Sequence, residues 1–219
     1  MVSFRKYWVP AACVLCYLAC FGDAIALYLF GREYPGYRHV ADTISTLGAT
    51  KSPVSDQISA WWMIIGSVFV VLALAFNEVY KERGRNVRIA AWLIALYGLG
   101  EGWGSGLFKA DHVGRALTTS AIVHDILGGI GSLASLVLPL VMLRVFPKKE
   151  RPGFYVFTVV IFCTGAVVSL LFTSNHFSSS AISSYTGLWQ RLTIAVHYVY
   201  FMAIAGVVLK ELKQEGETP

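Results

Sequence analysis

Long apolar segments alternate with short polar segments along this chain, and their lengths predict its architecture. Six apolar segments are each long enough to cross about 30 Å of hydrocarbon at about 1.5 Å per helical residue. Backbone groups in lipid must be hydrogen-bonded internally, so we expect every such segment to be helical. The sequence therefore predicts an all-α integral membrane protein with one domain over residues 1–219, whose six transmembrane helices lie at about 7–30, 57–79, 88–108, 118–146, 154–174 and 188–209.

The composition agrees with a membrane protein. Hydrophobic residues make up 56% of the chain and charged residues only 14%, whereas a soluble domain carries about 25% charged residues. The first apolar segment contains Asp23 and shows no small-residue cleavage site before Gly31. We therefore expect this segment to be retained as a helix rather than removed as a signal peptide.

The positions of Lys and Arg predict the orientation in the membrane. Of the 18 basic residues, twelve lie at the two ends of the chain or in the segments near 80–88 and 144–151. Since cytoplasmic segments carry an excess of Lys and Arg, both termini should be cytoplasmic. We thus expect a multi-pass protein of the cell inner (plasma) membrane. The net charge of +5 reflects this asymmetry, and we expect the lipid bilayer, not a nucleic acid, as the partner.

Seven polar or charged side chains lie at a similar depth, in the outer third of the predicted helices. Burying a charge near the centre of a bilayer costs at least about 2.5–3.5 kcal/mol, so such residues are candidates for function. The helical rise places Asp23, Glu101, His124 and His197 roughly 9–14 Å inside their helices. Four helices thus present polar groups to one layer, which predicts a polar pocket that faces outward. The seven residues are Asp23, Glu101, His124, Asp125, Gln190, Arg191 and His197.

Three kinds of chemistry are compatible with this set. Histidines with a carboxylate could hold zinc or another divalent metal, although neither HxxxH nor HExxH spacing is present. A buried carboxylate with a histidine could instead perform acid–base catalysis without a metal, and the same groups could relay protons in a carrier. Hydrogen bonding between helices is the structural alternative for each residue. The candidates are Glu101, Asp125 and Asp23 for catalysis, Gln190, Arg191, Asp42 and Ser45 for substrate binding, and His124, His197, His112 and His176 for a metal.

The longest predicted loop, 31–56, follows the first helix and belongs to the outer side. Its Gly, Pro and Ser residues are typical of a loop, but residues 40–47 are amphipathic enough for a short interfacial helix. Asp42 and Ser45 lie in this segment, so the loop could complete the pocket.

Several short motifs resemble a known family. Residues 42–48, Asp-Thr-Ile-Ser-Thr-Leu-Gly, resemble the (D)xISxLG signature of a six-helix prokaryotic membrane family catalogued as domain of unknown function 998. So do Asp111 after the third helix, His124 before a glycine-rich stretch, and the segment 187–191 that leads to His197. This resemblance spans most of the chain and implies six helices, but no activity.

A more distant likeness is to the membrane hydrolases that include alkaline ceramidases. These enzymes hold zinc with three histidines near Ser and Asp residues and cleave lipid amides. The present chain has one helix fewer and lacks their paired histidines in the last helix, where His197 stands alone. The likeness implies hydrolysis of a lipid amide or ester at the pocket.

Our leading hypothesis is a membrane-embedded hydrolase of a lipid or lipid-linked substrate. In this hypothesis the histidines hold a metal or move protons, Glu101 or Asp125 is the general base, and Gln190 or Arg191 orients the substrate. The alternatives are a small transporter or ligand-binding receptor that uses the same pocket without chemistry, and a purely structural membrane subunit. The inner half of the predicted bundle is almost free of polar residues, which argues against a carrier.

Overall fold

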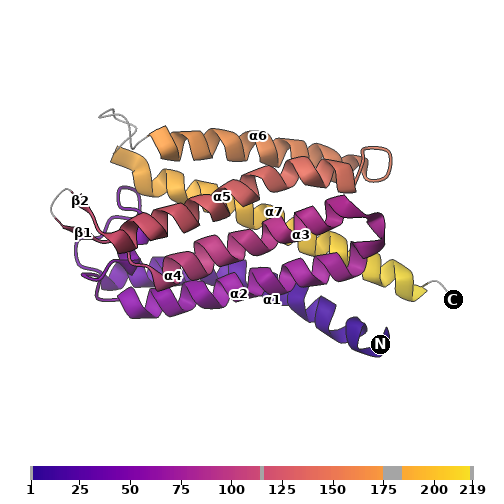
Figure 1. Ribbon diagram of the computed structural model, residues 1–219, viewed down its shortest axis with the longest axis horizontal. Helices are drawn as coiled ribbons and strands as arrows, with labels where there is room; N and C mark the ends of the chain where they lie inside the picture. Colours follow the sequence, from indigo (N-terminus) through magenta and orange to yellow (C-terminus); the bar gives the residue numbers. More distant parts are fainter. Residues whose placement is uncertain (1, 114–115, 175–183, 218–219) are drawn as a thin grey trace.

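Six helical segments form a bundle (Figure 1) in the computed structural model, which describes the backbone of residues 2–113, 116–174 and 184–217 and the side chains of 5–111, 116–174 and 184–215. Five of them are single long helices: α1 (Val2–Glu33), α2 (Ser55–Tyr80), α5 (Thr119–Val145), α6 (Pro152–Ser174) and α7 (Thr186–Glu217). The sixth is divided among α3 (Arg85–Tyr97), the π-helix η3 (Gly98–Gly104) and α4 (Ser105–Leu107). The shorter elements are the 3-10 helices η1 (Ile44–Gly48) and η2 (Lys81–Arg83) and the strands β1 (His112–Val113) and β2 (Ala116–Leu117).

The six predicted helices are confirmed, and the five undivided ones are each long and apolar enough to cross a membrane. The first and last helices extend beyond their predicted ends, α1 to residues 2–33 and α7 to 186–217. Helices continue past the hydrocarbon where polar residues remain helical in water, which hydropathy alone does not detect. Two details differ from the sequence-based expectation. The short outer helix covers Ile44–Gly48 rather than 40–47, and β1 pairs antiparallel with β2 in a two-residue hairpin.

The helices are arranged as a ring. Helix α1 packs against α2 and α7, the α3–η3–α4 segment packs between α2 and α5, and α6 packs between α5 and α7. Helix α2 also contacts α7, which divides the interior of the ring.

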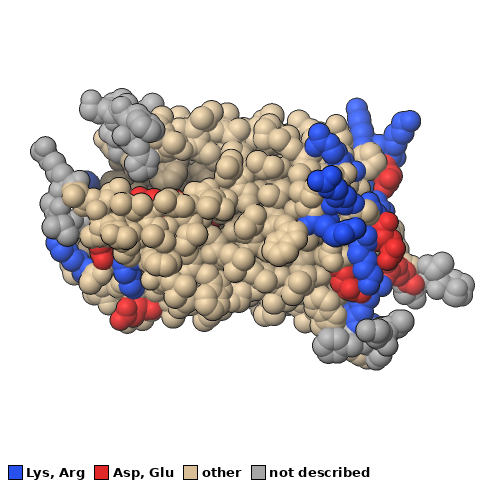
Figure 2. All heavy atoms as spheres, in the orientation of Figure 1, with Lys and Arg blue, Asp and Glu red and all other residues tan. Residues whose placement is uncertain are grey.

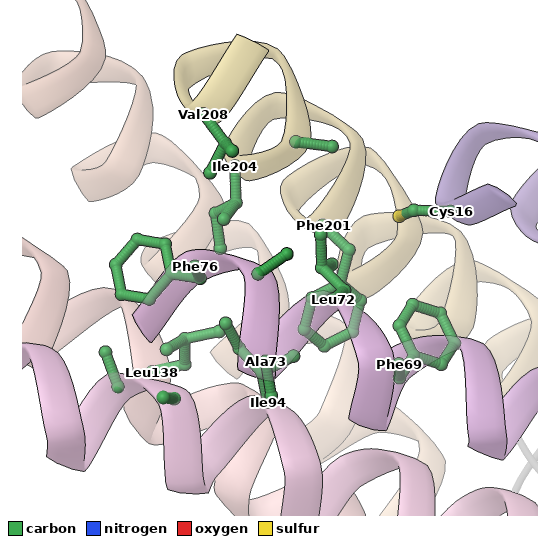
Figure 3. Packing of buried hydrophobic residues seen from close by; sticks show 14 of the residues in the cluster. Cys16, Phe69, Leu72, Ala73, Phe76, Ile94, Leu138, Phe201, Ile204 and Val208 are labelled. Carbon is green, nitrogen blue, oxygen red and sulfur yellow. The ribbon is translucent and has the colours of Figure 1, made fainter. Parts of the chain in front are cut away.

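The half of the bundle nearest the termini has a solid apolar core. Phe69 of α2 and Phe201 of α7 are almost fully buried, and their ring centroids are 4.7 Å apart. Figure 3 shows these side chains with Leu72 of α2, Ile94 of α3 and Cys16 of α1 in the same cluster. Burial of such side chains from lipid and water fixes the helices relative to one another.

Glycines let the α3–η3–α4 segment approach both of its neighbours closely. A Cβ atom at Gly102 would lie 2.8 Å from the carbonyl oxygen of Trp62 in α2, and one at Gly100 would lie 2.8 Å from the backbone nitrogen of Gly131 in α5. Real Cβ atoms do not approach backbone atoms so closely, so only glycine fits at these positions. The alternating glycines of GLGEGWG therefore serve two opposite helix contacts, and Glu101 lies between them.

Charged residues gather at the ends of the bundle. Figure 1 shows both termini at the same end, and Figure 2 shows many Lys and Arg side chains at that end and none across the middle of the visible face. Some of these charges are paired, since Arg83 lies 2.6 Å from Glu150 and Arg151 contacts Glu211. The uncharged middle band is the surface expected for a protein whose helices lie in a bilayer.

Candidate functional site

A polar cavity lies in the half of the bundle away from the termini. Its volume is about 40 Å³, and since one water needs about 10–15 Å³ by this measure, it has room for about three waters. The walls come from α1, η1, α2, the α3–η3–α4 segment and α7. The polar side chains that line it are Asp23, Ser45, Tyr97, Glu101, Ser105, Gln190 and Tyr198. The structure thus brings four of the candidate residues, Asp23, Ser45, Glu101 and Gln190, to one cavity.

Ser45 of η1 is hydrogen-bonded to His124 of α5. The Oγ atom of Ser45 lies 3.1 Å from Nε2 of His124, and Nδ1 of the same ring lies 2.9 Å from the carbonyl oxygen of Phe108. A carbonyl oxygen only accepts, so Nδ1 donates to Phe108, and in the neutral form of the ring Nε2 is the nitrogen that accepts from Ser45. The chain just after α4 thus selects the tautomer of His124 that can accept from the Ser45 hydroxyl.

This pair depends on two local features of the chain. Helix α4 ends at Leu107, and Phe108 has extended backbone angles, which leave its carbonyl free to accept from the imidazole. His124 is buried, with 5% of its surface exposed, so its hydrogen bonds are shielded from bulk water. A serine whose hydroxyl meets an imidazole that is held by a second group is the arrangement of an activated nucleophile.

Glu101 brings a carboxylate to the same cavity. Its Oε1 atom accepts a hydrogen bond from the hydroxyl of Ser132 on α5. Glu101 lies in the π-helical segment, where the backbone nitrogen of Ser105 bonds to the carbonyl of Gly100, five residues back. Single turns of π-helix are frequent at functional sites, because the wider turn redirects side chains. Here the widened turn lies beside the cavity that Glu101 lines.

Asp23 is buried, with 2% of its surface exposed, and it accepts from two neutral donors. The indole nitrogen of Trp61 on α2 lies 2.9 Å from Oδ1, and the hydroxyl of Tyr198 on α7 lies 2.9 Å from Oδ2. These contacts join three helices below the cavity. Both carboxylate oxygens are thus engaged, which is the pattern of a structural hydrogen-bond centre.

Gln190 and Arg191 hold the outer loop against α7. Gln190 accepts from the backbone nitrogen of Ile44 at 2.6 Å. Arg191 donates to the carbonyl oxygen of Asp42 at 3.1 Å and to the hydroxyl of Tyr37 at 2.5 Å. The carboxylate of Asp42 accepts from the backbone nitrogen of Arg38 at 2.6 Å. Arg191 and the Asp42 side chain therefore fix the loop, whereas Gln190 also lines the cavity.

A second set of contacts holds the other end of the loop. Asp111 accepts from the backbone nitrogen of Thr50 at 2.8 Å, and Lys109 donates to the hydroxyls of Ser55 and Ser59 at 2.8 Å each. The segment that carries Ser45 is thus attached to α7 on one side and to the chain after α4 on the other. Such attachment keeps Ser45 in register with His124.

The environment of Arg191 changes the acidity of two loop residues. Burial, followed by the positive charge of Arg191, lowers the pKa of His39 from its usual value. Burial raises the pKa of Tyr37 although Arg191 opposes this effect. Both residues therefore stay neutral near pH 7, and His39 Nδ1 lies 3.4 Å from a nitrogen of Arg191 as an acceptor.

Comparison with known proteins identifies the family. A family model described as "Protein of unknown function (DUF998)" matches residues 11–207. The chain belongs to this family. The matched range contains the whole cavity lining and the Ser45–His124 pair. No curated protein and no solved structure matches the chain, and the likeness to alkaline ceramidases finds no support in these comparisons.

The remaining candidate residues of this DUF998 protein lie apart from the Ser45–His124 pair. Both ring nitrogens of His197 lie within 3.1 Å of Ser135 Oγ on α5, and its ring packs edge-on against Tyr97. Asp125 is exposed on the surface of α5. His112 belongs to β1, but its side chain lies outside the described residues, and His176 lies outside them altogether.

The described side chains do not assemble a metal centre. In the part of the chain with described side chains, no three His, Cys, Asp or Glu residues lie close enough to hold one ion. Both ring nitrogens of His124 are engaged by Phe108 and Ser45, while His197 contacts Ser135. A tetrahedral zinc site needs three or four such ligands around one point, so the described residues do not fit the ion.

Sequence reasoning missed the groups that hold the candidate carboxylates. Ser132 is four residues beyond Gly128 and eight beyond His124, so helical spacing could have placed it at the site. Trp61 and Tyr198, which hold Asp23, carry no comparable signal. Aromatic residues are common in membrane helices, and only the packing of three helices shows that these two donate to a carboxylate.

Proposed function

We propose that this DUF998 protein is a membrane-embedded hydrolase that cleaves an ester or amide bond of a lipid or lipid-linked substrate. The hydrogen bond between Ser45 and His124 is the observation that carries the proposal. It joins Ser45, which lines the polar cavity, to a base on α5, and the carbonyl of Phe108 orients this base. The same three features define activated serine nucleophiles on unrelated folds.

The reaction follows from the two side chains. Ser45 Oγ attacks the carbonyl carbon of the substrate, and its proton passes to Nε2 of His124. The tetrahedral intermediate collapses, His124 returns the proton to the leaving alcohol or amine, and Ser45 is left acylated. A water that gives its proton to His124 then releases the acid and restores the serine. General base assistance of this kind contributes about 10²–10⁴-fold to the rate.

The lining of the cavity favours a neutral carbonyl substrate. Two carboxylates, Asp23 and Glu101, line it, and no Lys or Arg does so among the described residues. Phosphate esters are bound by cationic groups, which this lining lacks. The apolar side chains of Trp62, Ile65 and Phe69 complete the walls. Glu101 is placed to accept a hydrogen bond from a hydroxyl or amine of the substrate or from the attacking water.

The orientation in the membrane gives the substrate its source. With the basic end of the bundle in the cytoplasm, the cavity lies in the outer half of the inner membrane. Lipids of the outer leaflet are then the substrates within reach. The apolar core between the cavity and the cytoplasmic end supports an enzyme over a carrier, since it leaves no polar route inward.

The proposal is tested by covalent labelling of the detergent-purified protein with an alkyl fluorophosphonate, detected by intact-protein and peptide mass spectrometry. We expect one adduct on Ser45. Ser45→Ala should abolish it, and His124→Ala should slow it at least about 100-fold because the base is lost. Addition of EDTA should leave the labelling unchanged, because no step uses a metal.

Ser105→Ala is the matched control. Ser105 lines the same cavity but is not one of the hydrogen-bond partners of His124, which are Phe108 and Ser45, so its variant should label at the rate of the wild type. A folded wild type that acquires no adduct, or an adduct that His124→Ala does not slow, would contradict the proposal. In the first case the cavity would be a ligand-binding site without chemistry.

A further inference from the structure

The side chain of Gln190 is fixed in a known orientation beside Ser45. The backbone nitrogen of Ile44, the residue before Ser45, lies 2.6 Å from Oε1 of Gln190. A backbone N–H can only donate, so the oxygen of the amide must face Ile44. The NH₂ group therefore points away from this contact, and among the described residues it has no hydrogen-bond partner.

The side chain of Gln190 belongs to the lining of the cavity. Gln190 and Ser45 both line its walls, on α7 and on η1. The amide is attached to the residue next to Ser45, so the amide nitrogen and the Ser45 hydroxyl are positioned by the same contact. A donor that is held in place before the reaction costs no reorganisation when charge develops beside it.

We infer that the amide of Gln190 donates a hydrogen bond to the oxyanion that forms when Ser45 attacks a carbonyl group. This inference rests on the proposed hydrolase function and adds a catalytic residue to it. As Ser45 Oγ bonds to the carbonyl carbon, the electron pair of the C=O bond moves to the oxygen, and the Ser45 proton moves to His124. The negative oxygen then accepts a hydrogen bond from Gln190 Nε2–H. When the leaving group departs, the electron pair on this oxygen forms the C=O bond again.

The surroundings make such a donor necessary. The cavity holds two carboxylates and no Lys or Arg among its described lining residues, so no cation there can offset an oxyanion. A neutral amide can donate to the oxyanion, and unlike Lys or Arg it does not attract a phosphate or carboxylate to the same position. Removal of one oxyanion donor in a serine hydrolase lowers kcat by about 10²–10³-fold.

The structure suggests a variant that separates donation from anchoring. Gln190→Glu keeps an oxygen to accept from Ile44 and replaces the NH₂ group with a second oxygen. Gln190→Met removes both functions without adding charge. Thr193→Val is the control on the same helix, because the Thr193 hydroxyl bonds to the Trp189 carbonyl outside the cavity. Each variant of the full-length protein is assayed with p-nitrophenyl butyrate in detergent, and its melting temperature is recorded.

We expect kcat to fall at least about 100-fold in both Gln190 variants, with KM changed little and with wild-type values for Thr193→Val. Gln190→Glu should keep the wild-type melting temperature. A wild-type kcat in either Gln190 variant would overturn the inference. If the wild type is labelled at Ser45 and both Gln190 variants react normally, only the role of Gln190 fails. An unlabelled, inactive wild type would instead overturn the hydrolase function and this inference together.

Discussion

At the scale of single residues, the hydrogen-bond partners of the buried acids distinguish their roles. Asp23 and Glu101 both line the cavity, and both lie at the depth where the sequence predicted a site. Asp23 has each oxygen engaged by a neutral donor, whereas Glu101 accepts from Ser132 through Oε1. We therefore assign Asp23 to the stability of the bundle and keep Glu101 as a group that meets the substrate.

Replacement of Asp23 tests this assignment. Asp23→Leu leaves the Trp61 indole and the Tyr198 hydroxyl without acceptors, and each unpaired buried donor costs about 1–3 kcal/mol. We expect the free energy of unfolding to fall by about 2–6 kcal/mol in total. Asp23→Asn should lose less, because the amide oxygen can still accept and its NH₂ can donate to Tyr198. Thermal unfolding in detergent measures both variants.

Asp125→Leu is the matched control, since Asp125 lies at a similar predicted depth but is exposed on α5. It should unfold at or above the temperature of the wild type. Equal losses in Asp23→Asn and Asp23→Leu would show that the negative charge itself, rather than the two hydrogen bonds, stabilises the three helices.

At the scale of helices, the hydrophobic pattern predicted where crossings lie, and the glycines decided how they meet. The length of each apolar segment was enough to find six helices. The sequence GLGEGWG indicated close packing, but nothing in it distinguished a π-helix from an α-helix. In the structure, Gly66 of α2 and Gly131 of α5 approach the segment from two sides. Contacts between residues that are far apart in the sequence cannot be predicted from the spacing of residues within one segment.

A single added methyl group tests the packing of this segment. A Cβ at Gly102 would meet the backbone of Gly66 and lie 2.8 Å from the Trp62 carbonyl oxygen, so α2 and η3 must separate. Overpacking of this kind costs about 1–3 kcal/mol, and we expect Gly102→Ala to unfold earlier by this amount. Gly129→Ala on α5 meets nothing within 4 Å and should be neutral or stabilising by up to about 1 kcal/mol. Melting curves that do not separate the two variants would contradict the close contact.

At the scale of the whole molecule, the layered distribution of polarity was predictable and the detailed site was not. The similar depths of Asp23 and Glu101 followed from the helical rise alone, and both line one cavity together with Gln190. The pairing of Ser45 with His124 did not follow, because it requires a loop residue to meet a helix 79 positions away. The sequence also did not predict that His124 would contact Ser45 and that His197 would contact Ser135. Their separation depends on how the ring of helices closes.

The orientation of the whole bundle in the membrane is the remaining prediction, and two variants with one introduced cysteine each test it. Lys51 lies on the outer side of the predicted topology and Lys148 in the segment between α5 and α6, near the termini. In a Cys163→Ala background, the native thiols Cys13, Cys16 and Cys20 are buried in α1. A membrane-impermeant maleimide should modify Lys51→Cys in right-side-out vesicles and Lys148→Cys only in inside-out vesicles. The opposite pattern would place the cavity in the cytoplasmic leaflet, because the cavity and Lys51 share one end of the bundle, and substrates of the inner leaflet would replace those of the outer.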